Sequence, residues 1–384
     1  MQLSRVLEQQ IAVFGETGSG KTVLLSSFYG ATQEPRYLQR NFFHVIADDI
    51  GQGARLHRNY LGMRDSARMP TATKFAATSY SFCVKLRDGS AATDASYRPF
   101  DALRLIWHDY PGEWFDQDVS GPEEAQRRID TFRSLLGADV ALLLVDGQRL
   151  LDHAGEEERY LKSLLVNMRN GLLSLKDDLL AGGKPLVEFP RIWMMALSKA
   201  DLLPHLDVFK FRDLLIDKAC DEIDELRKVL VGLVEAGDAL SMGEDFVLLS
   251  SAKFEAGKIK LTERVGLELI LPLAAVLPFE RHVRWTQAWQ IPGKVAENLL
   301  NGAGALAAAL IGHRSSRLPG PLGSLVNLFG PDVVNDAFTL AGDKLRKMNS
   351  EAVAKKEHLS ATLTGFRMDL DNGEEKQILL RSRR

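Results

Sequence analysis

One stretch near the start of the chain has the residue types and spacing of a phosphate-binding loop. Residues 15–22 read G-x-x-x-x-G-K-T, follow an apolar run at 11–14 and precede a helical-looking segment at 23–28. Glycines let backbone N–H groups turn towards phosphate oxygens, and the helix adds the positive end of its dipole. Lys21 adds a charge near the β- and γ-phosphates, and the Thr22 hydroxyl can hold Mg²⁺. We therefore expect the chain to bind a nucleoside triphosphate. The predicted phosphate-binding residues are Gly15, Glu16, Thr17, Gly18, Ser19, Gly20, Lys21 and Thr22.

A second motif follows the apolar segment at 103–108, which reads as a strand. It is Asp109-Tyr110-Pro111-Gly112, a D-x-x-G sequence. A carboxylate there can reach Mg²⁺ through water, and a glycine N–H can face a γ-phosphate. The alternative is a plain β-turn. The position at a strand end, downstream of a phosphate-binding loop, favours the functional interpretation.

Two further strand ends carry residues that can recognise a base. The apolar run at 192–197 ends in Ser198-Lys199-Ala200-Asp201, and the run at 246–249 is followed by Ser-Ser-Ala-Lys at 250–253. An aspartate can accept hydrogen bonds from N1–H and the exocyclic amine of guanine, a donor pair that adenine lacks. A lysine stem can pack against the plane of the base. Lys199 and Asp201 therefore predict a guanine site.

A mainly parallel sheet must position these motifs, because each follows a predicted strand. The segment at 140–146 is apolar throughout, as a central strand is, and the segments at 80–87 and 103–108 read as a hairpin with one antiparallel strand. Apolar stripes at helical spacing, at 161–179 and 215–234, favour core packing over a partner surface. The pattern predicts an α/β domain with helices on both faces of the sheet.

Composition restricts the other function classes. The chain has 384 residues, a net charge of −3, two cysteines and eight scattered histidines. These values indicate neither nucleic-acid binding nor a metal cluster, and Cys83 and Cys220 read as small core residues. The start of the chain reaches its first strand without an apolar leader, so we expect a cytoplasmic protein.

Taken in order, the four motifs resemble those of Ras-like P-loop GTPases of the translation-factor-related class. The insertions and the sequence from Asp109 to Trp114 make the chain similar to the larger bacterial members, including those of double-GTPase type. The resemblance implies GTP or GDP binding and Mg²⁺-dependent hydrolysis, with Gly112 sensing the γ-phosphate. It implies a magnesium site formed by Thr22, Asp109 and a switch threonine. Support for guanine recognition is implied for Ser251, Ala252 and Lys253.

The switch threonine has three candidates, namely Thr71, Thr73 and Thr78. Thr73 is favoured because residues 70–73 resemble the P-x-x-T found at this switch in some bacterial GTPases. The alternative is a solvated loop threonine.

Three departures from the family pattern concern hydrolysis and base recognition. Ser198 replaces the usual asparagine, and its hydroxyl can still tether the phosphate-binding loop with fewer hydrogen bonds. Glu113 stands where a glutamine normally orients the attacking water, and Thr17 stands where glycine is common. The predicted catalytic residues are Lys21, Gly112 and Glu113, and we expect slow turnover accelerated by a partner, or by self-association, that supplies an arginine.

The domain organisation follows from where the motifs stop. We expect a GTPase domain at 1–284, with insertions at about 34–68 and 204–244, and a C-terminal helical extension with a basic tail at 285–384. The apolar stretch at 299–312 is too short to span a bilayer. It reads as a packed helical cap or as a hydrophobic hairpin that contacts a partner or membrane. The tail reads as a strand-containing end or a flexible basic extension.

Three functions are compatible with these features. The first is a GTP-controlled molecular switch with slow hydrolysis, which acts on a protein effector. The others are a hydrolysis-poor GTP-dependent scaffold and a GTPase that associates peripherally with membranes.

Overall fold

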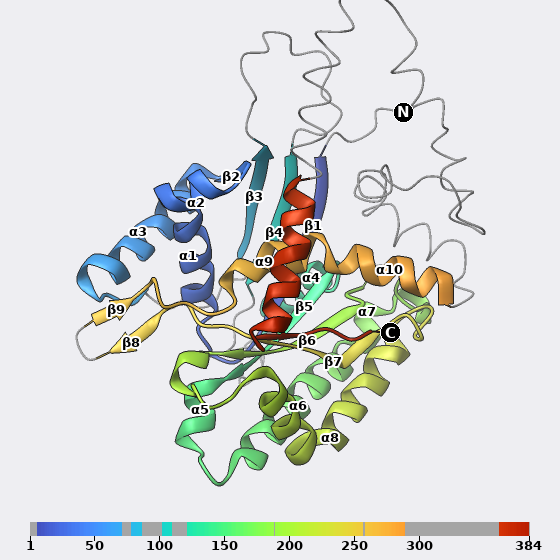
Figure 1. Ribbon diagram of the computed structural model, residues 1–384. Coiled ribbons are helices and arrows are strands. Elements are labelled where there is room, and N and C mark those ends of the chain that lie inside the picture. Colours follow the sequence, from blue (N-terminus) through green and yellow to red (C-terminus); the bar gives the residue numbers. More distant parts are fainter. Residues whose placement is uncertain are drawn as a thin grey trace, which may run out of the picture.

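An eight-stranded sheet organises the part of the chain that the structure describes. The computed structural model describes residues 6–70, 78–86, 102–109, 121–187, 189–255, 258–288 and 361–383. The strand order is β10-β7-β6-β5-β1-β4-β3-β2, and helices cover both faces (Figure 1). The strands are β1 (Val6–Phe14), β2 (Phe43–Ala47), β3 (Thr78–Leu86), β4 (Ala102–Asp109), β5 (Val140–Asp146), β6 (Ile192–Ser198), β7 (Ser241–Leu248) and β10 (Leu379–Leu380), and a separate hairpin comprises β8 (Lys253–Glu255) and β9 (Lys258–Lys260).

Helices connect most of these strands. They are α1 (Lys21–Thr32), α2 (Pro35–Arg40), α3 (Ile50–Ser66), α4 (Pro122–Leu135), α5 (Gly147–Asp152), α6 (Glu157–Ser174), α7 (Lys176–Leu179), α8 (Val208–Leu233), α9 (Ile270–Ala275) and α10 (Leu277–Ala288). Residues 361–375 are also helical. The predicted α/β class is confirmed.

The strand directions bring the sequence motifs to one edge of the sheet. Strand β1 pairs in parallel with β4 and β5, β5 with β6, and β6 with β7. The carboxyl ends of these five strands therefore lie at the same edge. The predicted hairpin is present, since β3 pairs antiparallel with β4. Strand β2, inside the insertion at 34–68, and the short antiparallel strand β10 extend the sheet at its two ends.

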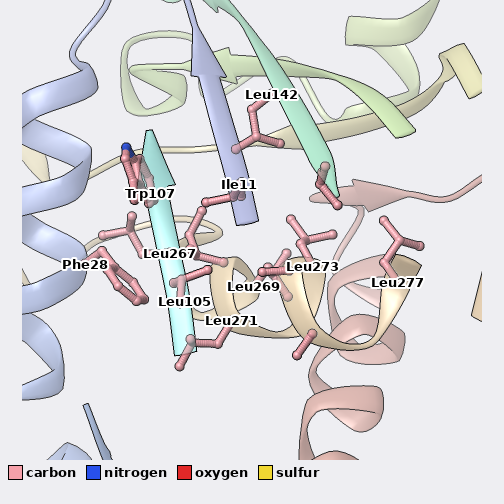
Figure 2. Packing of buried hydrophobic residues seen from close by; sticks show 14 of the residues in the cluster. Ile11, Phe28, Leu105, Trp107, Leu142, Leu267, Leu269, Leu271, Leu273 and Leu277 are labelled. Atoms are coloured by element: carbon pink, nitrogen blue, oxygen red, sulfur yellow. The ribbon is translucent and has the colours of Figure 1, made fainter. Parts of the chain in front are cut away.

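The core lies on both faces of the central strands. Every residue of β5 and β6 is buried, as expected for strands covered on both sides. On one face, Ile11, Leu105 and Trp107 meet residues of α1 and of the segment at 267–277 (Figure 2). On the other face, the predicted apolar stripes of α6 and α8 pack on the sheet, so the core interpretation of both stripes is confirmed.

The end of the chain returns to this core. Leu363, Phe366 and Leu370, in the helix at 361–375, are buried in the same cluster as Ile11, on the face that α9 and α10 cover (Figure 1). Leu379 of β10 pairs with Val247 of β7. Of the two alternatives for the tail, the structure therefore has the strand-containing end. The apolar stretch at 299–312 lies outside the described residues, and the domain boundary expected at residue 284 stays a prediction.

None of the helices in the described ranges is long and apolar enough to cross a membrane.

Candidate functional site

The loop between β1 and α1 has the backbone shape that its glycines predict. Gly18 and Gly20 have φ angles of 86° and 89°, a left-handed conformation that a side chain strains. Gly20 is the N-cap of α1, whose first residue is Lys21 and whose second is Thr22. A Cβ at Gly15 would lie 2.7 Å from the Ser19 hydroxyl oxygen, so the loop is closely folded. Backbone N–H groups at the start of α1 therefore face the space where phosphates bind in such loops.

The polar groups of the loop fit an anionic ligand. Lys21 Nζ donates to the carbonyl oxygens of Gly15 (2.7 Å) and Glu16 (3.1 Å), acceptors that phosphate oxygens can replace. The Ser19 hydroxyl is buried and has no hydrogen-bond partner among the described residues. Glu16 forms an ion pair with Arg149 of α5 at 2.9 Å, and its side chain is 6% exposed. The carboxylate of Glu16 is thus neutralised beside the loop instead of opposing an anion.

Lys199 lies next to this loop. It follows β6 in a left-handed conformation (φ 52°), and a Cβ built on Gly20 would lie 3.9 Å from Lys199 Cε. The lysine stem therefore passes the N-terminal end of α1. Its Nζ forms an ion pair with Asp146 Oδ2 at 2.8 Å. Asp146 was not among the predicted site residues, although an aspartate that ends an otherwise apolar strand is a signal for one.

Asp201 is held by the loop that follows β7. The Ser250 hydroxyl oxygen lies 2.6 Å from Asp201 Oδ1 and 2.6 Å from the carbonyl oxygen of Ala252, so two acceptors compete for its single proton. The Phe254 amide donates to Asp201 Oδ2 (3.3 Å). The sequence motif predicted support from residues 251–253, whereas the contacts to Asp201 come from the residues on either side of that segment. Ser250 could have been identified from its place in the run Ser-Ser-Ala-Lys, because either serine of this run can supply a hydroxyl to Asp201.

The three predicted supporting residues lie at different depths. Ser251 and Ala252 are buried, with exposed fractions of 6% and 0%. Lys253 is half exposed and forms ion pairs with Glu263 (3.5 Å) and Glu255 (3.8 Å). Ser251 and Ala252 are thus buried parts of the loop that contacts Asp201, and Lys253 lies at the protein surface.

Ser198 makes a different contact from the one expected. Its buried hydroxyl donates to the carbonyl oxygen of Val145 on β5, at 3.3 Å. The single hydroxyl proton is therefore used between two strands, and among the described residues it is not donated to the phosphate-binding loop. The physical reason is reach, because a serine side chain is one atom shorter than that of asparagine and carries one donor instead of two.

The magnesium and switch residues are described only in part. Thr22 is partly buried at the start of α1. The backbone of Asp109 ends β4, in register with Val13 of β1 on one side and Thr78 of β3 on the other. This register brings the aspartate backbone to the same sheet edge as the phosphate-binding loop. Gly112, Glu113, Thr71 and Thr73 lie outside the described residues, so their roles stay predictions.

His108 precedes Asp109 on β4, and its ring lies between Ser79 of β3 and Gln10 of β1. The ring is 7% exposed, and its nitrogens lie 2.9 Å from Ser79 Oγ and 2.9 Å from Gln10 Oε1. Burial lowers the pKa of His108 to about 4. It is therefore a neutral core histidine at physiological pH.

Residues 9–181 match the family model described as Double-GTPase 2. No curated protein matches the sequence. Among solved structures, nucleolar GTP-binding protein 1 of Plasmodium falciparum is 12% identical with a TM-score of 0.32, and the match covers 74% of this chain and 92% of that one. The cytosolic domain of the T. maritima FeoB iron transporter, in a GDP form, is 13% identical with a TM-score of 0.28. That match covers 94% of this chain and 98% of the FeoB chain. The GTPase-like domain of S. cerevisiae Ski7, bound to GTP, is 15% identical with a TM-score of 0.28. That match covers 64% of this chain and 43% of the Ski7 chain.

Proposed function

We propose that this chain, a P-loop GTPase of the double-GTPase type over residues 9–181, binds GTP with Mg²⁺ and hydrolyses it slowly as a molecular switch. The observation that carries the proposal is the place of Lys199 beside the phosphate-binding loop, two residues before Asp201. Lys199 runs past Gly20, and Asp201 is oriented by two donors. Base and phosphate recognition are thereby close enough to serve one nucleotide.

Asp201 supports guanine as the base. Among the described residues, each of its carboxylate oxygens accepts one hydrogen bond. A carboxylate oxygen has a second lone pair, so both oxygens retain an acceptor site for N1–H and the exocyclic amine of guanine. Adenine presents a single donor and an acceptor on the corresponding edge, which disfavours it.

The phosphate end of the site supports triphosphate binding. Lys21 would exchange the carbonyl oxygens of Gly15 and Glu16 for phosphate oxygens, and N–H groups at the start of α1 would bind the same anion. Thr22, Asp109 and Thr73 would hold Mg²⁺, whose chemistry here is to neutralise charge on the phosphates. Their oxygen donors suit that ion.

Slow hydrolysis follows from two residues of the proposed site. A carboxylate at Glu113 is repelled by the γ-phosphate, and it orients water less readily than the neutral amide of glutamine. Thr17 adds a side chain at a position where glycine is common. A partner or a second copy that supplies an arginine would raise the rate, since such arginines contribute about 10³–10⁵-fold in kcat.

Single-turnover hydrolysis with Mg²⁺ at several protein concentrations tests this part of the proposal. We expect slow phosphate release, and a rate that rises with concentration identifies self-activation. Lys21→Ala, which removes the phosphate-binding charge, serves as the inactive control. Tight GTP binding without phosphate release at any concentration would instead favour the scaffold function.

A further inference from the structure

Asp146 forms an ion pair that the proposed guanine site does not yet explain. Its side chain is 4% exposed, whereas that of Lys199 is 29% exposed, and the two are joined by a 2.8 Å contact between Oδ2 and Nζ. The pair links the ends of adjacent parallel strands, because Asp146 lies in register with Ser198. Burying a carboxylate costs free energy unless it is paired and hydrogen-bonded. Hydrophobic packing of β5 alone therefore gives no reason for an aspartate here.

The carboxylate of Asp146 is fixed independently of the lysine. Its Oδ1 accepts a hydrogen bond from the Gln148 amide (2.9 Å) as the N-cap of α5. Its backbone N–H donates to the Tyr160 hydroxyl oxygen at 2.8 Å. With Oδ1 and the backbone held in this way, Oδ2 presents a rigid acceptor to Lys199.

The Lys199 side chain is flexible, and a fixed acceptor such as Asp146 Oδ2 restricts it to one conformation. The lysine side chain has four rotatable bonds, and ordering it costs rotamer entropy. The backbone at Lys199 packs closely on α5, since a Cβ at Gly147 would lie 2.7 Å from the Ser198 carbonyl oxygen and 2.9 Å from that of Lys199. Both the backbone and the Nζ end of Lys199 are therefore set by the start of α5, and the stem between them runs past Gly20.

We propose that Asp146 is a positioning residue for guanine-nucleotide binding, which acts through Lys199. It holds Nζ so that the lysine stem is already placed where the plane of the base would pack, and the entropy of ordering that stem is not lost on binding. This inference rests on the proposed function, because it concerns the base end of the same site. It assigns a role in recognition to a residue that does not itself face the nucleotide.

Asp146→Asn tests the role, because asparagine retains the N-cap acceptor of α5 and removes only the charge that holds Lys199. We expect the affinity for GDP with Mg²⁺, measured by calorimetry, to fall about tenfold, while the affinity for inorganic tripolyphosphate is unchanged. Asp207→Asn is the matched control, because Asp207 is likewise a helix N-cap, accepting from the amides of Phe209 and Lys210. Within the described ranges, its ion pair is with Lys210 and it has no hydrogen bond or ion pair with Asp146 or Lys199. Asp146→Ser, a second neutral capping residue, is used if the asparagine variant does not fold.

A double-mutant cycle with Lys199→Met shows whether Asp146 acts through the lysine. The proposal predicts that Asp146→Asn lowers GDP affinity in the wild-type background and causes no further loss in the Lys199→Met background. Equal losses in both backgrounds, or an equal loss of tripolyphosphate affinity, would overturn it by showing a general structural role. If the wild-type chain binds tripolyphosphate but not GDP, the proposed function fails instead, and the two failures are thereby distinguished.

Discussion

Asp201 accepts hydrogen bonds from the Ser250 hydroxyl and the Phe254 amide, and these two donors fix the carboxylate plane. A fixed plane matters for base recognition, because the two oxygens must meet two neighbouring donors of guanine together. The specificity of the site is therefore a property of one side chain and the two groups that orient it.

Replacing Asp201 by asparagine should change which base is preferred. The asparagine amide presents a donor where guanine also has one, whereas xanthine has a carbonyl oxygen there. We expect Asp201→Asn to lower affinity for GDP by about 100-fold and to raise affinity for xanthosine diphosphate, measured by competition against a fluorescent nucleotide. Asp213→Asn, an exposed change on α8, is the control. Retained preference for GDP would mean that the base is read elsewhere.

The two adjacent serines give a second prediction. Because the Ser250 hydroxyl contacts Asp201, Ser250→Ala should lower GDP affinity about tenfold without affecting tripolyphosphate binding. Ser251→Ala should leave GDP affinity within about twofold of wild type. The reverse order of effects would show that the segment 251–253 supports the base in the way the sequence motif first indicated.

The site residues that the sequence motifs identified share one property, which is their characteristic spacing along the chain. Lys21, Lys199 and Asp201 occur at spacings that phosphate and guanine chemistry require, so the pattern itself points to them. Asp146 and Ser250 act on other side chains, and their contacts depend on which strands are neighbours. The hydrogen bond of Ser198 to Val145 could not be predicted from the sequence for the same reason, because it depends on which strands are neighbours.

At the level of elements, α1 connects the phosphate-binding loop to the insertion at 34–68. Gly30 of α1 faces Tyr60 of α3, and a Cβ at Gly30 would lie 2.1 Å from the tyrosine ring. Tyr60 and Met63 of α3 also pack with Ala252 and Ile259, around the hairpin that follows the Asp201-binding loop. The insertion thus packs against both halves of the proposed site.

A pair of glycine substitutions tests this packing. Gly30→Ala should lower the free energy of unfolding by about 1–3 kcal/mol, because the tyrosine must move to accept the methyl group. Gly232→Ala, at an exposed position of α8 with no atom within 4 Å of the new Cβ, should raise it by about 0.5–1 kcal/mol. Urea denaturation gives both values. A Gly30→Ala variant as stable as wild type would contradict the close contact of α1 with α3.

Long elements were easier to predict than short ones. The stripes of α6 and α8 continue over several turns, and their period distinguishes them from strands. Strand β2 has five residues, and a short apolar run fits a strand or a buried helix equally well. The segment around it was accordingly recognised as an insertion without its strand being assigned to the sheet.

On the scale of the whole molecule, the C-terminal end completes the sheet. Ser382 donates its amide to Asp245 Oδ1 at 2.8 Å, and Arg281 of α10 donates to the same oxygen at 2.8 Å. Both members of the Arg281–Asp245 pair are almost fully buried, with side-chain exposures of 1% and 0%. Strand β7, α10 and the chain end are therefore joined at one buried charge. Local sequence patterns could not predict this contact, because it joins residues more than 130 positions apart.

Arg281→Met tests how much the free energy of unfolding depends on the buried Arg281–Asp245 ion pair. The change leaves Asp245 buried without its countercharge, which costs about 3–5 kcal/mol of unfolding free energy. Adding Asp245→Asn removes the buried charge, and the double variant should recover much of the loss. Urea denaturation of the two variants and wild type makes the comparison. Equal stabilities for all three proteins would show that the pair does not join these elements in solution.

Nucleotide competition shows whether one site recognises guanine and phosphate together. The purified chain, stripped of bound nucleotide and supplied with Mg²⁺, is loaded with a fluorescent GTP analogue and challenged with unlabelled GTP, ATP or inorganic tripolyphosphate. We expect GTP to displace the analogue at concentrations at least about 100-fold lower than ATP does. Displacement by ATP and GTP at equal concentrations would contradict guanine recognition by Asp201.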